Sequence, residues 1–177
     1  MRTRARLPFM HRRIRDKSNM IIVGIAEMRV SHDPKVSLIT YSLGSCLGIA
    51  IYDPAVRVGG MLHAMLPEAD LGADNARKSP SLFVDSGVAM LFRSAYKLGA
   101  DKRRIIVKAA GGAELLDEDR FFGIGHRNHE SLTEILQRNG VALTASAVGG
   151  NASRTMRLDM ATGKISITIP GQPEFEL

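Results

Sequence analysis

Short segments rich in apolar and β-branched residues, separated by turns, constrain the fold of this chain more than any other feature. They comprise residues 20–30, 37–43, 47–52, 57–66, 103–110, 141–148, 154–160 and 164–170. Glycine, proline, Asp or Asn marks most of the intervening turns, a pattern typical of strands that are joined by hairpins. We therefore expect an α+β domain with a mostly antiparallel or mixed sheet.

Two segments have the spacing of apolar residues that indicates a helix. The first begins near Pro80, with Ser79 as its candidate cap, and ends at Gly99. Proline is favoured in the first turn of a helix, and glycine directly after its end. The second is predicted to begin after Asn128 and to stop at residues 139–140. Strands thus outnumber helices, and a layered arrangement with two main helices is expected.

The net charge of +6 is located in the N-terminal segment. Residues 1–18 carry seven Lys or Arg and one acidic residue, Asp16, so that residues 19–177 have no net charge. The segment has no pattern of apolar residues that could pack into a core, which predicts a solvated, disordered tail rather than a nucleic-acid-binding arm. Residues 19–177 are long enough to form one domain with a core of its own, and we expect a single catalytic domain there.

Several classes of protein are excluded by composition. No apolar run approaches the roughly 20 residues that span a bilayer, and the N-terminus lacks the apolar region of a secretory signal. Cys46 is the only cysteine, which excludes an internal disulfide and a multi-cysteine zinc site. His126 and His129 have helical spacing, but no acidic cluster completes a metal site, so a solvated helix start is expected. The cytoplasm is the expected compartment.

The lone cysteine lies close to a histidine in a predicted hairpin. Residues 47–52 and 57–66 flank a proline-containing turn, which we place at residues 53–56. A turn at these residues pairs Cys46 directly with His63 on one face, with Cβ atoms ~5 Å apart. A shift of one residue would put the two side chains on opposite faces, so this pairing depends on the turn.

A thiol beside an imidazole can act as a nucleophile with its base. The imidazole takes the proton and favours the thiolate, which predicts a lowered pKa for Cys46. Such a pair performs acyl transfer: attack on a carboxamide or ester carbonyl, then hydrolysis of the thioester. The opposing interpretation, a small buried thiol and a packed core histidine such as His63, stays open at this point.

Residues near the cysteine could complete such a site. Gly44 allows a sharp turn before Ser45, so the backbone N–H groups of both residues are candidates to face an oxyanion. Thr40 and Ser42 are the hydroxyl candidates for orienting the imidazole. Residues 44–48 also match G-x-C-x-G, but a nucleophile elbow needs a helix after the nucleophile, and β-type residues follow here.

The chain resembles the chemoreceptor glutamine deamidase family, CheD, from about Met20 to about Ile169. The motifs that carry this resemblance are Leu43–Cys46, Tyr52–Pro54, Gly59–Gly60, His63–Pro67, Lys108–Ala113, Gly125–Asn128, Val148–Gly150 and Arg154. No single one of these short motifs is specific, but all occur in order and at suitable spacing.

The resemblance implies a fold, a site and a reaction. The fold would be a layered α/β/β sandwich, and the catalytic residues would be Cys46, His63 and Thr40. The reaction would be hydrolysis of glutamine side chains on methyl-accepting chemotaxis receptors, with neither a cofactor nor a metal. The chemotaxis phosphatase CheC would be a possible partner. The alternative is a non-catalytic adaptor of the same fold that binds a receptor or phosphatase.

Overall fold

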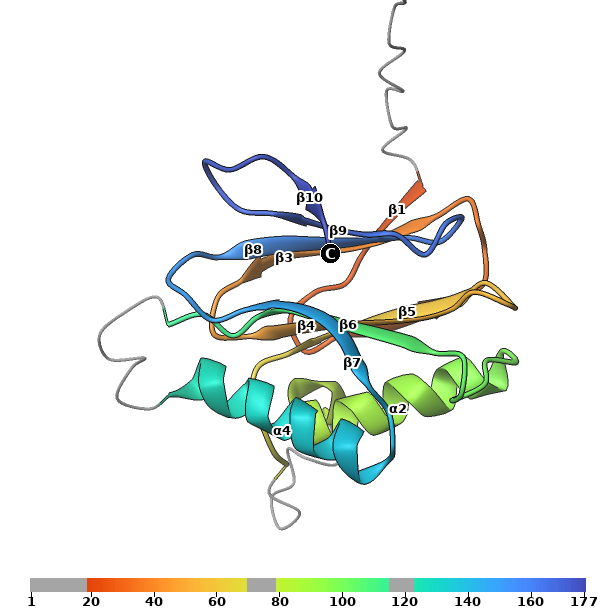
Figure 1. The fold of residues 1–177 in the computed structure, drawn as a ribbon, viewed down its shortest axis with the longest axis horizontal. Coiled ribbons are helices and arrows are strands. Elements are labelled where there is room, and N and C mark those ends of the chain that lie inside the picture. Colours follow the sequence, from red (N-terminus) through yellow and green to blue (C-terminus); the bar gives the residue numbers. More distant parts are fainter. Residues whose placement is uncertain (1–18, 70–78, 115–122) are drawn as a thin grey trace, which may run out of the picture.

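Three layers make up the part of the chain that the computed structural model describes, residues 19–69, 79–114 and 123–177 (Figure 1). The predicted basic tail, residues 1–18, lies outside the described residues. In chain order the elements are β1 (Met20–Ile22), β2 (Met28–Ser31), β3 (Ser37–Leu43), β4 (Leu47–Asp53), β5 (Val58–Ala64), the 3₁₀ turn η2 (Pro80–Leu82), α2 (Val84–Lys97), β6 (Ile106–Gly111), α4 (Ile124–Arg138), β7 (Leu143–Val148), β8 (Arg154–Asp159), β9 (Ile165–Thr168) and β10 (Phe175–Glu176).

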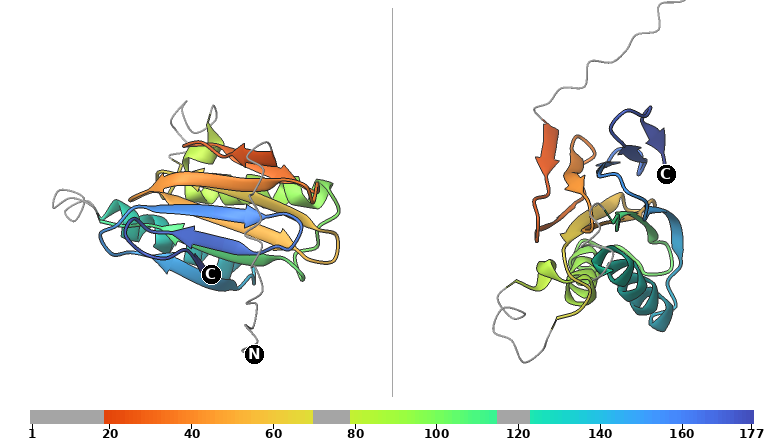
Figure 2. Two further views of the ribbon diagram at one scale, coloured as in Figure 1. Left: turned by 90° about the horizontal axis from the view of Figure 1, so that it is seen from above. Right: turned by 90° about the vertical axis from the view of Figure 1, so that its left-hand side faces the viewer.

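Two mixed sheets and a layer of helices form the sandwich. The outer sheet has the order β1-β3-β8-β9-β10, and the central sheet has the order β2-β5-β4-β6-β7. In each sheet one edge strand runs parallel to its neighbour, β1 to β3 and β7 to β6, and the other pairs are antiparallel. Helices α2 and α4 cover the free face of the central sheet (Figures 1 and 2). The predicted α+β class and the α/β/β sandwich are thus confirmed.

The layers bury two separate cores. One lies between the helices and the central sheet and includes Leu62, Leu91 and Leu132, and the other lies between the two sheets and includes Leu38 and Met156. Every residue of β4 and β5 is buried. A strand that is covered on both faces needs such a continuous run of apolar or small residues, which explains the uninterrupted apolar segments in the sequence.

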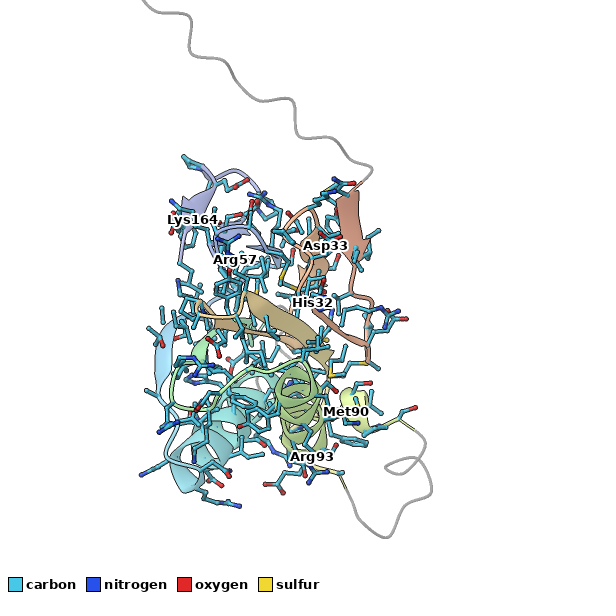
Figure 3. All side chains as sticks on the ribbon, turned by 90° about the vertical axis from the view of Figure 1, so that its right-hand side faces the viewer. His32, Asp33, Arg57, Met90, Arg93 and Lys164 are labelled. Atoms are coloured by element: carbon cyan, nitrogen blue, oxygen red, sulfur yellow. The ribbon has the colours of Figure 1, made fainter. Side chains whose placement is uncertain are left out.

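The outermost faces belong to the outer sheet and the helices. Met90 and Arg93 on α2 lie on the side of the molecule opposite Lys164, which precedes β9 (Figure 3). Among the described residues, no helix is long and apolar enough to cross a membrane.

Three predicted boundaries differ from the structure. Residues 20–30 form two strands in different sheets, because the chain turns between Gly24 and Glu27, with Ala26 in the left-handed region. Helix α4 starts at Ile124, five residues before the predicted start, after Gly123 with a φ of 56°. Pro80 begins a 3₁₀ turn, and α2 begins only after the extended residue Phe83.

The β4–β5 hairpin turns one residue beyond the point that is needed to pair Cys46 with His63, which shifts the cross-strand register by two residues. Asp53 pairs with Val58, so residues 54–57 form the loop, and Arg57 takes a φ of 53°. The Asp53 carboxylate accepts a hydrogen bond from the Ala55 N–H and forms an ion pair with Arg104. These contacts fix Asp53 as the last residue of β4 and move the centre of the turn by one residue.

Candidate active site

Thr40 and His63 meet between the two sheets. Thr40 comes from β3 of the outer sheet and His63 from β5 of the central sheet, and their side chains are 0% and 1% exposed. The Thr40 Oγ1 and the His63 Nδ1 are 2.7 Å apart and share a hydrogen bond. The other ring nitrogen, Nε2, is buried and has no hydrogen-bond partner among the described residues. The threonine thus fixes the ring and leaves Nε2 as a base or an acid for a further group.

Cys46 lies on an irregular loop between β3 and β4. The pairing of β3 with β8 is interrupted by a bulge between Thr40 and Leu43, and within this bulge Ser42 has a φ of 57°. The Gly44 N–H then donates to the Ser42 carbonyl over 2.9 Å, which closes a tight turn. The bulge redirects the chain from the outer sheet to the central sheet, and Cys46 is the last residue before β4 begins.

The strand register puts Cys46 and His63 on the same face of the central sheet but does not pair them with each other. Gly48, and not Cys46, pairs with His63, so the prediction that the cysteine and the histidine are direct cross-strand partners is wrong. Cys46 lies two residues before Gly48 and packs against the core between the sheets, the same space that holds the imidazole. Cys46 therefore lies on the same side of the central sheet as His63, directly before the paired part of β4.

Burial acts on both titratable groups of the site. It raises the pKa of the Cys46 thiol, and the backbone N–H of the same residue, which lies near the sulfur, acts in the opposite direction. Burial also lowers the pKa of His63. The prediction of a lowered Cys46 pKa is therefore wrong for this geometry. A neutral thiol and a neutral imidazole are the forms present at neutral pH.

Backbone hydrogen bonds and one side chain hold the cysteine loop. The carbonyls of Gly44 and Cys46 accept from the N–H groups of Ala113 and Gly112, each at 2.8 Å. The side-chain amide of Asn128 on α4 donates to the carbonyl of Ser45 at 2.9 Å. No separate signal in the sequence points to Asn128, because an asparagine near a helix start also fits a cap.

The other sequence candidates lie elsewhere. His126 is exposed on α4 and its Nε2 lies 3.1 Å from the Glu130 carboxylate in the next turn. No group of three or more His, Cys, Asp or Glu that could hold a metal occurs within residues 19–69, 79–114 and 123–177. After Cys46 the chain enters strand β4 and not a helix, which confirms that G-x-C-x-G is not a nucleophile elbow here.

Comparison with known proteins assigns the chain to a family. Residues 65–169 match the family described as "CheD chemotactic sensory transduction". A "Probable chemoreceptor glutamine deamidase CheD 1" from Syntrophus aciditrophicus is 45% identical over 157 residues, which are 89% of this chain and 98% of that protein. The chain belongs to the CheD family. The resemblance predicted from its motifs is thus confirmed.

Further CheD relatives come from other organisms. A "Probable chemoreceptor glutamine deamidase CheD" from Solibacter usitatus is 46% identical over 145 residues, covering 82% of this chain and 86% of the relative. One with the same name from Pyrococcus horikoshii is 40% identical over 145 residues, covering 81% and 88%. Among solved structures, the "hypothetical protein YfiH" of Bacillus licheniformis aligns with a TM-score of 0.40 at 14% identity, over 68% of this chain and 49% of that one, which is too distant to inform the CheD site.

Proposed function

We propose that this protein hydrolyses glutamine side-chain amides of chemotaxis receptors to glutamate, with Cys46 as the nucleophile of a thioester mechanism. The observation that carries the proposal is the Thr40–His63 hydrogen bond, which leaves a buried, unpaired Nε2 in the space that Cys46 enters. The names of the CheD relatives supply the substrate class.

The first half-reaction forms the thioester. For His63 to act as a base, its Nδ1–H donates to Thr40 Oγ1, so that Nε2 carries the free lone pair. Nε2 accepts the proton of the Cys46 thiol, and the sulfur attacks the carboxamide carbon of the glutamine. The protonated imidazole then donates this proton to the departing nitrogen, and ammonia leaves.

The second half-reaction releases glutamate. His63, again neutral, accepts a proton from a water molecule that attacks the thioester, and the Cys46 sulfur leaves as the thiol. Backbone N–H groups at the cysteine loop stabilise the oxyanion of both tetrahedral intermediates. Of the candidates Gly44 and Ser45, the Gly44 N–H already donates to Ser42, so the proposal relies on Ser45 and on Cys46 itself. Neither step needs a cofactor or a metal.

The cellular setting follows from the substrate. Since the proposed substrate is the cytoplasmic domain of a receptor, we expect the enzyme in the cytoplasm, and the proposed reaction involves no nucleic acid. The phosphatase CheC is a candidate regulator that would bind this protein. The same thioester would also serve hydrolysis of a glutamate methyl ester, and mass spectrometry of amidated and methylated receptor fragments separates the two activities.

Substitutions of the three residues test the proposal and distinguish it from a non-catalytic adaptor. Mass spectrometry of a receptor cytoplasmic fragment should show no conversion of glutamine to glutamate with Cys46→Ala, and almost none with His63→Ala. Thr40→Ala should lower the rate by ~10- to 1000-fold because the ring loses its orientation, and Thr40→Ser should recover part of the loss. Deamidation that persists in Cys46→Ala would refute the mechanism, and a wild-type protein that binds the fragment without converting it would favour the adaptor.

A further inference from the structure

Asn128 bridges the two segments that carry the proposed catalytic pair. Its side chain is 0% exposed, and its Nδ2 donates to the carbonyls of Ser45 and Met65, both at 2.9 Å. Ser45 directly precedes Cys46, and Met65 follows His63 by two residues. The two carbonyl acceptors also fix the orientation of the amide, because a reversed amide would direct its oxygen at both of them.

The hydrogen bond to Ser45 is one of three that hold consecutive carbonyls of the cysteine loop. The other two run from the Ala113 N–H to the Gly44 carbonyl and from the Gly112 N–H to the Cys46 carbonyl. In a planar trans peptide the N–H points away from the carbonyl of the same unit. Fixing the Gly44 and Ser45 carbonyls towards β6 and α4 therefore directs the Ser45 and Cys46 N–H groups to the other side.

These two N–H groups remain available to a ligand. Within the described residues, neither donates to another residue, and the Cys46 N–H faces its own sulfur. The N–H beside the nucleophilic sulfur is the group best placed to meet an oxyanion that forms when this sulfur attacks a carbonyl. Among these peptide units, only the orientation of the Ser45–Cys46 peptide depends on a side chain.

We propose that Asn128 is a positioning residue that holds the Ser45–Cys46 peptide so that the Cys46 N–H stabilises the oxyanion during acyl transfer. The inference rests on the proposed function, since it assumes that Cys46 forms a thioester. Without the Asn128 amide this peptide can rotate, and the N–H donor is lost. Loss of one oxyanion donor lowers kcat by roughly 10²- to 10³-fold in hydrolases, and loss of its positioning residue should cost about 10- to 100-fold.

Ser131 supplies a matched control on the same helix. Its hydroxyl is also buried and donates to a backbone carbonyl, that of Pro67, at 2.8 Å. Asn128 and Ser131 thus both tie α4 to the segment that follows β5, but only Asn128 contacts the cysteine loop. If such a hydrogen bond only stabilises the fold, its loss should have the same kind of effect in Asn128→Ala and in Ser131→Ala. Weaker stabilisation of the oxyanion should be seen in Asn128→Ala alone.

Two reagents that attack the same sulfur separate the roles. Acylation of Cys46 by p-nitrophenyl acetate forms a thioester through a tetrahedral oxyanion and releases p-nitrophenolate, whereas alkylation by iodoacetamide displaces iodide without an oxyanion. Asn128→Ala should lower the acylation rate by about 10- to 100-fold and the alkylation rate by less than about 3-fold. Ser131→Ala should change neither rate by more than about 3-fold. With a receptor fragment, Asn128→Ala should lower kcat and leave KM unchanged.

The alternative results have distinct meanings. A folded Asn128→Ala protein that is acylated at the wild-type rate, or whose two rates fall in parallel, would overturn the proposal. If Asn128→Ala does not fold, Asn128→Asp takes its place, because it keeps the side-chain volume but donates at most one hydrogen bond. A wild-type protein that deamidates no receptor, while Asn128→Ala still lowers acylation selectively, would refute the proposed function and support the role of Asn128.

Discussion

Gly111, the last residue of β6, contacts the cysteine loop so closely that a single methyl group should disable the site. A Cβ at Gly111 would lie 2.2 Å from the Cys46 carbonyl oxygen, and the residue has a φ of +110°. Gly99, after α2, offers a control with a similar φ of +93°, where a Cβ would meet nothing within 4 Å. Comparing Gly111→Ala with Gly99→Ala thus separates the cost of the steric contact from the cost of the backbone conformation.

The magnitudes follow from these contacts. A positive φ costs a non-glycine residue roughly 1–2 kcal/mol, which is the expected loss in free energy of unfolding for Gly99→Ala. In Gly111→Ala the Cys46 carbonyl must also retreat, which adds about 1–3 kcal/mol of overpacking. The same movement weakens the hydrogen bond from the Gly112 N–H to this carbonyl. This lowers the free energy of unfolding by about 1–3 kcal/mol more.

Thermal unfolding and acylation of Cys46 provide the assays. For a domain of this size a loss of 1 kcal/mol lowers Tm by roughly 2–4 °C, so Gly99→Ala should melt about 2–8 °C below the wild type. Gly111→Ala should melt further below it and should lose most of its acylation by p-nitrophenyl acetate, whereas Gly99→Ala should keep the wild-type rate. Equal melting temperatures and equal acylation rates in the two variants would refute the close contact between Gly111 and Cys46.

Three further outcomes are expected. Because burial raises the pKa of Cys46, its alkylation rate should rise with pH through an inflection above the roughly 8.5 of a free thiol, and an inflection below that value would contradict the buried geometry. For Asp53, burial alone would raise the pKa, but hydrogen bonds from Arg104, Asp101 and Ala55 outweigh it and lower the pKa. The ionised Asp53 carboxylate therefore contributes to the free energy of unfolding above pH ~4, and this contribution is lost as pH falls through the lowered pKa. Asp53→Asn should be about 1–3 kcal/mol less stable at pH 7. Its acid unfolding, followed by circular dichroism, should depend less on pH than that of the wild type. Removal of residues 1–18 should leave melting and deamidation unchanged, and a loss of either would show that the basic tail takes part in folding or in binding the receptor.

The sequence was most informative where the signal is local. The β4–β5 hairpin, strand β3 and the apolar face of α2 follow from residue spacing, and the structure contains all of them. The parallel pairing of β1 with β3 has no local signal, because it joins residues 20–22 to residues 37–39 across an intervening strand of the other sheet. For the same reason the sequence alone predicts one strand over residues 20–30, where the structure has two.

The residues of the proposed site could be named from the sequence, but their contacts could not. Thr40 could be chosen over Ser42 only by resemblance to the CheD family, because both are hydroxyl residues near Cys46. The structure gives the physical difference: Thr40 faces the space between the sheets, whereas Ser42 is exposed in the bulge. The register differs by two residues because contacts with Ala55 and Arg104 hold Asp53 at the end of β4 and because Arg57 adopts a left-handed conformation, which turn statistics do not favour for arginine.

The resting state of the site has a consequence for the proposed mechanism. The ordinary pKa of a thiol lies about 2 units above that of an imidazole, and burial moves both values in the directions that widen this gap. Each additional unit costs about 1.4 kcal/mol for transfer of the Cys46 proton to His63. Burial therefore opposes the ion pair in the free protein, and on the proposed mechanism the oxyanion that develops beside the imidazolium favours the transfer. The rate of acyl transfer to Cys46 would then depend less on the thiol alone than on two other features. These are the N–H donors that meet the oxyanion and the Thr40 hydrogen bond that selects the tautomer of His63. On the proposed mechanism, Cys46 would thus be selective for a carbonyl substrate and would react slowly with alkylating reagents.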